Sequence, residues 1–294
     1  MIADATSALP PHILLLIAFA AIVGLIVAIA KFKCNGIVAL TAASLLLGLA
    51  AGMDPKTVAQ SYTDGVANTM GGLAMIICLG TILAKLLAES GAAHVIAERL
   101  VALFGKERLD YAIMTAAFII GISVFFQVGV VLLGPIVFTL ARETKTPILR
   151  LGLPLAAGMS TAHGLIPPHP GPLVAIQKLG ANVGKTIEWS LFVVGPPVAL
   201  VTGPLIARWV TPRVPVALGG LGEKASATPS ATCRPGFAVS IFTMLLPVLL
   251  MIVATAVDVL WDEKNFPVGT WQGSIRTWAD FGGHPTVAML IAVL

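Results

Sequence analysis

The feature that most constrains this chain is residues 13–30, a run of 18 apolar residues that ends at Lys31. As a helix, a run of this length rises about 27 Å, close to the roughly 30 Å of hydrocarbon in a bilayer. Comparable apolar runs follow at 36–53, about 69–88, 189–210 and 237–260. A chain with several such runs is predicted to be an all-α polytopic membrane protein.

Charge is scarce along the whole chain. Only 11% of the 294 residues are charged and the mean hydropathy is +0.95, whereas a soluble domain carries about 25% charged residues. So few charges cannot cover the surface of a water-soluble fold, which excludes a soluble enzyme, a nucleic-acid-binding protein and a disordered protein. The net charge of +4 therefore matters through its distribution around a lipid bilayer.

The basic residues predict the orientation of the spans. With the N-terminus outside, 13 of the 18 Lys and Arg residues fall in cytoplasmic segments. The outside segments hold the other five, namely Lys56, Lys178, Lys185, Lys264 and Arg276. This bias follows the positive-inside rule.

Two polar stretches flank the run at about 69–88. The stretch before it, with Asp54 and Asp64, is interpreted as a loop. The stretch after it has an amphipathic pattern, which predicts a helix at the membrane surface. The apolar face of that helix comprises Ile96, Leu100, Leu103 and Phe104.

Residues 111–141 contain no charged residue, yet both of their flanks are basic. As one helix they would measure about 47 Å, too long for one span and too short for two. A re-entrant hairpin at about 111–141 would keep both basic flanks in the cytoplasm, and a tilted, kinked span is the alternative. Gln127 lies near the middle, where its amide could hydrogen-bond a polyol or only the local backbone.

A broken helix is predicted at about 148–180. Pro167, Pro168, Pro170 and Pro172 cannot all lie inside one helix. Two short helices around an unwound segment are therefore expected. Such backbone is tolerated at membrane depth only where it is buried in protein or lines a water-filled cavity.

The span count predicts an internal repeat. Residues 1–210 would form a first repeat, 211–236 a cytoplasmic linker, and 237–294 the start of a second repeat. Five crossings before the linker would make the second repeat inverted, and 284–294 weakly resembles 35–45. Because the last apolar run stops without a flanking charge, we expect the chain to be truncated at its C-terminus and the second repeat to be incomplete.

The strongest chemical signal lies in the predicted break. Polar side chains and free backbone there could bind an anion at the N-terminus of the second half-helix, with Pro172 as its first residue. The candidate substrate-binding residues are Ser160, Thr161, His163, Gly164, Pro167, Pro168, His169, Gly171 and, from the hairpin, Gln127. A proline-rich surface loop with solvated histidines is the alternative.

A more remote alternative is an intramembrane metalloenzyme, in which His163 and His169 would bind a metal ion. Two histidines six residues apart do not share a helical face, and no further metal-binding side chain is near them in the sequence. The sequence therefore predicts no metal site.

The break also carries a family resemblance. Residues 163–172, HGLIPPHPGP, resemble the H-G-x-x-P-P-H-P-G-P signature of the gluconate permease (gluconate:proton symporter) family. Shorter stretches agree, namely KFK at 31–33 with NG at 35–36, AESGA at 88–92, FGK at 104–106 and GKT at 184–186. The resemblance runs from about residue 13 to the end of the chain.

The resemblance implies a secondary active transporter in the cytoplasmic (inner) membrane of a bacterium. It would take up gluconate or a related sugar or hydroxy acid by proton symport, with His163 and His169 as proton-coupling candidates. It also implies ion-transporter-type inverted repeats. A permease for D-serine or another small hydroxylated acid is the alternative substrate class, and an inactive fragment of such a permease is the alternative for this chain. No cofactor, enzymatic activity or nucleic-acid partner is expected, and a homo-oligomer is compatible with the sequence.

One position departs from the family pattern. Many relatives carry a glutamate in F-F-x-E-[VI]-G, or a close variant, where this chain has Gln127. Because a glutamine takes up no proton, and if the family's glutamate helps to couple proton flow, coupling here is expected to use His163, His169 or a group outside the given residues, or to be altered.

Overall fold

The structure is a computed structural model that describes residues 9–216, 234–261 and 269–294. In these residues every regular element is a helix and no β-strand occurs, as predicted. Five of the described helices are long and apolar enough to cross a membrane, which makes this a multi-pass membrane protein. They are Pro11–Ala30, Pro55–Glu89, Phe126–Glu143, Val183–Val210 and Phe237–Leu260. The predicted linker at 211–236 lies largely outside the described residues.

The chain divides into two compact units, residues 1–72 and 73–294. In the first unit, α1 (Pro11–Ala30) packs against α2 (Gly36–Ala50). The side chain of Asn35 accepts hydrogen bonds from two backbone N–H groups in the first turn of α2. This N-cap satisfies donors that would otherwise have no partner, so α2 begins where the sequence turns apolar.

α3 (Pro55–Glu89) is longer than the predicted run of about 69–88, and the stretch interpreted as a loop is its beginning. The carboxylate of Asp54 accepts hydrogen bonds from two backbone N–H groups of the first turn, at 3.0 and 3.3 Å. Asp64 lies inside the helix and accepts a hydrogen bond from the side chain one turn earlier, at 2.8 Å. The loop interpretation was wrong because these polar residues stabilise the helix.

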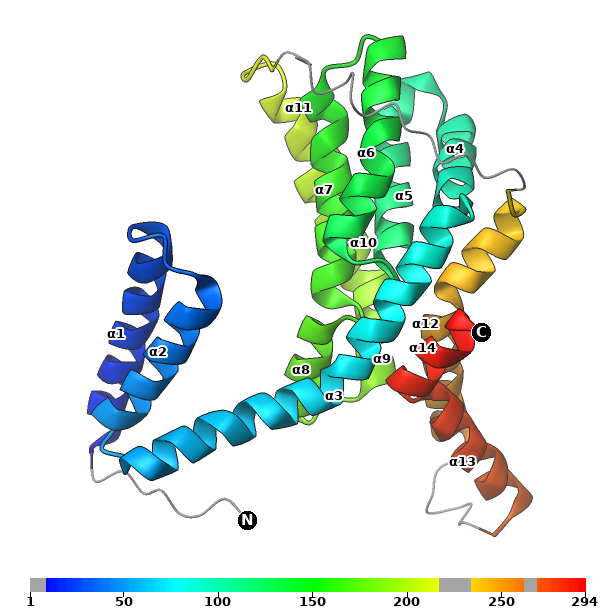
Figure 1. The fold of residues 1–294 in the computed structure, drawn as a ribbon. Coiled ribbons are helices and arrows are strands. Elements are labelled where there is room, and N and C mark those ends of the chain that lie inside the picture. Colours follow the sequence, from blue (N-terminus) through cyan, green and yellow to red (C-terminus); the bar gives the residue numbers. More distant parts are fainter. Residues whose placement is uncertain (1–8, 217–233, 262–268) are drawn as a thin grey trace. The chain divides into compact units, whose positions relative to one another are not determined.

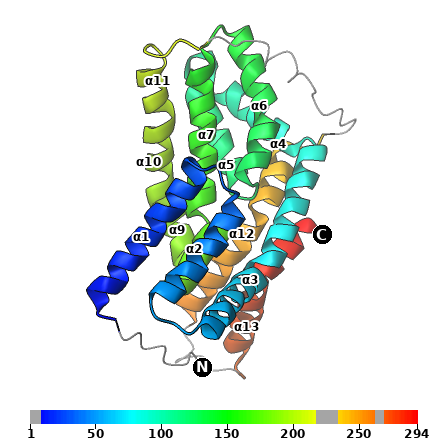
Figure 2. The same cartoon turned by 60° about the vertical axis from the view of Figure 1, so that its left-hand side comes forward.

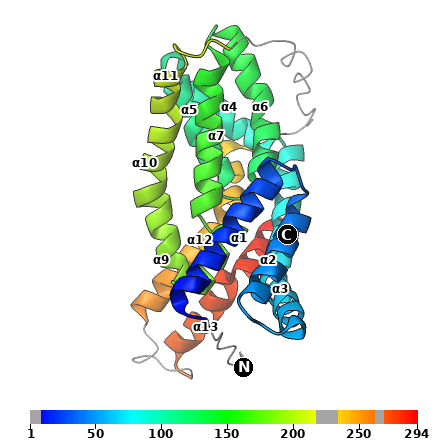
Figure 3. The ribbon, with the colours of Figure 1, turned by 90° about the vertical axis from the view of Figure 1, so that its left-hand side faces the viewer.

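The second unit is arranged around α7 (Ile148–Leu165), which lies between α5 (Leu109–Gly121) and α6 (Phe126–Glu143) on one side and the 183–210 helix on the other (Figures 1 and 3). α5 and α6 run in opposite directions and are joined by the turn 122–125 (Figure 1). The predicted hairpin segment is therefore a pair of helices joined by a turn.

The helix predicted after the run at about 69–88 is α4 (Ala92–Phe104). Ile96 is fully buried, as is Ala93, and α4 packs against α5 and α12 (Phe237–Leu260). Leu103, which was assigned to the same apolar face, is 64% exposed. The predicted apolar face is therefore only partly buried within the protein, since Ile96 packs inside it and Leu103 does not.

Residues 183–210 form one long helical rod beside α7 (Figure 2). Its α-helical parts are α9 (Val183–Glu188), α10 (Gly195–Leu200) and α11 (Ile206–Val210), separated by two wider π-helical segments, 189–194 and 201–205. Prolines in this rod lack a backbone donor, so the regular hydrogen-bond ladder gives way locally to the wider turns.

The C-terminal part of the unit packs on α12. α13 (Trp271–Gly283) and α14 (Pro285–Val293) both contact it. Together with α4, α12 thereby joins the end of the chain to the helices around α7.

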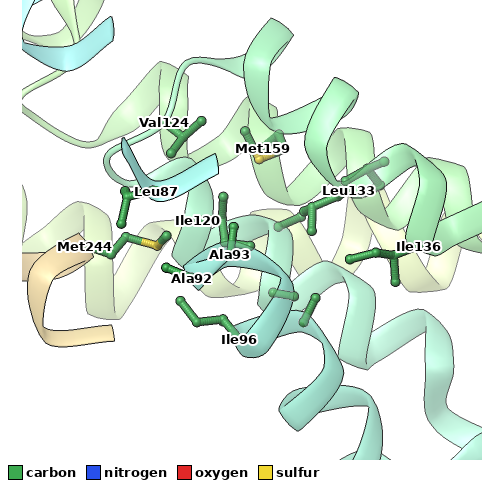
Figure 4. Packing of buried hydrophobic residues seen from close by; sticks show 14 of the residues in the cluster. Leu87, Ala92, Ala93, Ile96, Ile120, Val124, Leu133, Ile136, Met159 and Met244 are labelled. Atoms are coloured by element: carbon green, nitrogen blue, oxygen red, sulfur yellow. The ribbon is translucent and has the colours of Figure 1, made fainter. Parts of the chain in front are cut away.

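The main hydrophobic core draws on seven helices, α3–α7, α12 and α14, and on the α5–α6 turn, and Figure 4 shows part of it. Figure 4 labels Leu87, Ala92, Ala93, Ile96, Ile120, Val124, Leu133, Ile136, Met159 and Met244. The hydroxyl of Ser123, in the turn, donates a buried hydrogen bond to the Met244 carbonyl of α12. The turn between α5 and α6 is therefore held inside the protein.

Candidate functional site

The helix that begins at Ile148 is broken at 166–169, and α8 (Pro170–Leu179) follows. Ile166 has φ −106° and ψ 122°, the extended conformation expected of a residue that precedes a proline. His169 is the N-cap of α8, so the second helix begins at Pro170 and not at the predicted Pro172. Pro170 suits that position because the first helical N–H needs no partner.

Three aromatic rings meet at this break. The ring centroids of His163 and His169 are 4.4 Å apart, and each lies 5.8 Å from the ring centroid of Phe125. Phe125 belongs to the turn between α5 and α6, so the break and the turn form one cluster. The sequence predicted that both histidines belong to one site, and the structure brings them together.

Two helix N-termini converge on the same cluster. Phe125 is the N-cap of α6 and His169 is the N-cap of α8, and neither side chain caps its own helix. In α8, prolines occupy two of the first three positions, which leaves Gly171 as the free N–H donor. Helix N-termini carry partial positive charge and unpaired N–H groups, so the pair forms an environment that favours an anion.

The two histidines have different hydrogen-bond environments. His169 is 4% exposed, and its Nε2 donates a hydrogen bond to the Gly121 carbonyl at 2.6 Å. That carbonyl is the last of α5. His163 is half-buried in the last turn of α7, and its buried Nδ1 has no hydrogen-bond partner among the described residues. His169 is thus engaged in the structure, while the buried Nδ1 of His163 is left without a hydrogen-bond partner among the described residues.

The other predicted substrate-binding residues differ in their exposure to solvent. Ser160 and Gly164, one helical turn apart, are both exposed, and so are Gly171 and Gln127. The others are buried, namely Thr161, Pro167 and Pro168. Gln127 lies in the first turn of α6, two residues after Phe125, and therefore near the cluster along the chain.

Close packing of α5 on α7 makes the cluster geometry feasible. A Cβ atom at Gly158 would lie 2.5 Å from the Met114 carbonyl oxygen, so only glycine fits without movement. A Cβ atom at Gly121 would lie 3.0 Å from the Ala162 side chain. These small residues let the two backbones approach, which brings the Gly121 carbonyl within reach of His169.

A second polar cluster lies where α5 and α7 begin and α11 ends. Asp110 is 1% exposed, and its two carboxylate oxygens accept hydrogen bonds from Nε and Nη2 of Arg208 at 2.6 and 3.1 Å. Nε of Arg150 lies 3.7 Å from the same carboxylate. The guanidinium of Arg208 also lies 4.6 Å from the Tyr111 ring centroid. This buried ion cluster ties three helix ends together.

Sequence reasoning missed two parts of this arrangement. The ring of Phe125 and the carbonyl of Gly121 complete the first cluster, although only Gln127 was singled out nearby. The pairing of Asp110 with Arg208 was also missed. Its available signal was that Asp110 is the last charged residue before a long uncharged stretch, where a buried carboxylate needs a cationic partner.

The prediction of no metal site concerns His163 and His169, and the finding below covers the residues that the structure describes. No group of three or more His, Cys, Asp or Glu side chains among them could hold a metal ion.

The fold and the site together define a class of protein, a polytopic helical membrane protein with a broken helix next to a helix–turn–helix segment. Residues 13–294 match the family described as GntP family permease, and the chain belongs to that family. No solved structure matches this chain.

Curated relatives agree with the family match. The chain is 43% identical to a gluconate permease of Pseudomonas aeruginosa, 41% identical to a gluconate permease of Zymomonas mobilis, and 35% identical to the Gnt-II system L-idonate transporter of Escherichia coli. These alignments cover 95–96% of this chain and 61% of each relative. The chain therefore spans about three fifths of the length of these relatives.

Proposed function

We propose that the full-length protein is a secondary active transporter in the bacterial inner membrane, which takes up gluconate or a related sugar acid by proton symport. The observation that carries this proposal is the convergence of two helix N-termini, at Phe125 and His169, on the histidine pair. Family membership supports transport, and the geometry supports an anionic substrate.

The carboxylate of the substrate would bind between the two helix N-termini. The Gly171 N–H at the start of α8 and the first-turn N–H groups of α6, including that of Gln127, would donate hydrogen bonds to it. Helix dipoles favour this placement without a charged side chain. Pro167 and Pro168 would act by keeping the backbone unwound.

The hydroxyl groups of the substrate would contact the exposed face formed by Ser160 and Gly164. Ser160 offers a hydroxyl there, and the Gln127 side chain offers an amide from the neighbouring segment. Thr161 is only 6% exposed, so its contact with substrate would require this part of the packing to open.

His163 is the stronger candidate for proton coupling. Its buried Nδ1 has no hydrogen-bond partner among the described residues, so it would take up a proton or a substrate hydrogen bond when the packing around it opens. His169 already donates to the Gly121 carbonyl and would mainly hold the break in place. Gln127 would bind without carrying a proton.

The topology would follow the predicted repeat. We infer that α5 and α6 form a re-entrant hairpin with both ends in the cytoplasm, because basic residues flank it on both sides. Lys106 and Arg108 precede α5, Arg142 lies in the last turn of α6, and Lys145 follows α6. Residues 1–210 would be the first repeat, and 237–294 would begin an inverted second repeat. The substrate site would then lie near the interface of the repeats.

The test is uptake of labelled gluconate into proteoliposomes under an imposed inward proton gradient. This chain would be compared with a version extended to the full length of the relatives. The proposal expects accumulation by the extended version and its loss on addition of an uncoupler. Transport only down the gluconate gradient would contradict symport and direct attention to Gln127.

Because one relative is named as an L-idonate transporter, sugar acids are the first class of compounds to compare. If the extended version moves neither gluconate nor idonate, the sugar-acid assignment is wrong. D-serine and shorter hydroxy acids would then be tested in the same vesicles, because they carry the same carboxylate with fewer hydroxyls.

A further inference from the structure

Two adjoining cavities lie at the end of the second unit that carries the Asp110 cluster. Their volumes are about 690 Å³ and 420 Å³, and both are lined by Pro147 and Thr211. The larger lies where α6 is followed by α7, and the smaller beside the end of α11. We refer to the two together as the basic pocket.

The basic pocket carries an excess of positive charge. Arg142 and Lys145 line the larger cavity, and Arg150 and Arg208 line the smaller one. Among the described residues that line the two cavities there is no carboxylate. Arg208 is bound by both oxygens of Asp110, but Arg150 lies 3.7 Å from that carboxylate and is 40% exposed. Arg150 therefore retains donors that can face the smaller cavity.

The pocket is apolar as well as basic. Ile148 and Leu149 line the larger cavity, as do Val214 and Val216, which are 46% and 47% exposed. A small soluble anion would bind to the basic residues alone and would not need this apolar surface. An amphiphile would use both, because its charged group needs the basic lining and its hydrocarbon needs the apolar lining.

The depth of the pocket in the membrane is indicated by Trp209. This residue is 62% exposed on α11, directly after Arg208, and the guanidinium of Arg213 lies 4.6 Å from its ring centroid. Exposed tryptophans with basic neighbours are typical of the headgroup level of a bilayer. The positive-inside bias places this level on the cytoplasmic side.

We propose that the basic pocket binds the headgroup of an anionic phospholipid. The phosphate would lie between Lys145 and Arg150, and an acyl chain would follow the exposed valines. Basic pockets between helices on the cytoplasmic side have the charge that such headgroups require. The proposal is separate from transport, since it concerns neither the histidine cluster nor the substrate.

The test measures lipid binding to the purified chain by native mass spectrometry from a neutral detergent. The chain is offered equal amounts of phosphatidylglycerol and phosphatidylcholine with the same acyl chains. The first variant is Lys145→Gln with Arg150→Gln. The matched control is Lys31→Gln with Lys33→Gln, which removes the same charge from exposed positions, and Lys33 shares the positive φ of Lys145 (54° and 55°). Circular dichroism checks that all three proteins keep their helix content.

We expect the original chain and the Lys31/Lys33 control to prefer phosphatidylglycerol by about tenfold or more, because each basic residue near an anionic surface adds several-fold. The Lys145/Arg150 variant should lose most of that preference. Equal binding of both lipids by the original chain, or an equal loss in the control, would overturn the proposal. So would displacement of the lipid by millimolar inorganic phosphate, which would indicate a soluble-anion site.

Discussion

The rings of Phe125 and His169 lie 5.8 Å apart although 44 residues separate them, and each residue is the N-cap of a different helix. The contact therefore joins the start of α6 to the start of α8. Because both helix ends are directed to the same cluster, a change at one is expected to alter the other.

Replacement of Phe125 tests this link. Phe125→Leu removes the edge contacts with both histidine rings but keeps an apolar side chain. Aromatic pairs contribute about 0.5–1.5 kcal/mol each, so we expect gluconate uptake by the extended protein to fall about fivefold or more. Phe192→Leu, at a position 67% exposed, is the control. Unchanged uptake by Phe125→Leu would show that the ring contacts are incidental.

The free ring nitrogen of His163 leads to a separate prediction. His163→Ala should abolish uptake without preventing membrane insertion. His163→Gln keeps hydrogen-bonding groups but takes up no proton, so it should lose proton-driven accumulation while retaining exchange of external for internal gluconate. Both fluxes are measured in the same vesicles, with His12→Ala as a control at an exposed position. Accumulation by His163→Gln would exclude His163 as the proton carrier.

Close packing of α5 on α7 predicts a loss of stability in Gly158→Ala. The added methyl group would meet the Met114 carbonyl oxygen at 2.5 Å and the Ala117 side chain at 2.9 Å. Overpacking of this kind costs about 1–3 kcal/mol, and thermal unfolding in detergent would show a lower Tm. Gly152→Ala on the same helix is the control, since nothing lies within 4 Å of its added methyl group. Equal Tm values for the two variants would contradict the packing described here.

Because Asp110 is buried, we expect Arg208→Gln to lower the stability of the protein. Removing one partner of a buried ion pair costs about 3–5 kcal/mol, and we expect about 2 kcal/mol here because Arg208 is 40% exposed and Arg150 remains 3.7 Å away. Addition of Asp110→Asn should restore part of the loss, since it removes the unpaired charge.

Unfolding in detergent measures both effects on the Asp110 cluster. Arg213→Gln, which removes an arginine at an exposed position, should change the unfolding temperature little. A double variant with Asp110→Asn that is no more stable than Arg208→Gln alone would show that charge is not the cause.

Much of the architecture could be predicted from the sequence because its causes lie in neighbouring residues. The run at 13–30 and the break around Pro167 depend on side-chain hydropathy and on missing N–H groups within a few positions. The stretch around Asp64 was mispredicted for a related reason. Polarity was interpreted as a loop, whereas a capping carboxylate and an i,i+4 hydrogen bond continue the helix.

By itself, the sequence determined that this chain is helical, enters the membrane and unwinds before His169, because hydropathy and proline geometry act locally. Only the tertiary structure decided that Phe125 meets the histidines and that Asp110 pairs with Arg208, 98 residues away. These contacts depend on how closely α5 and α7 pack. That distance is set by small residues such as Gly158, whose role becomes visible only when the two backbones lie side by side.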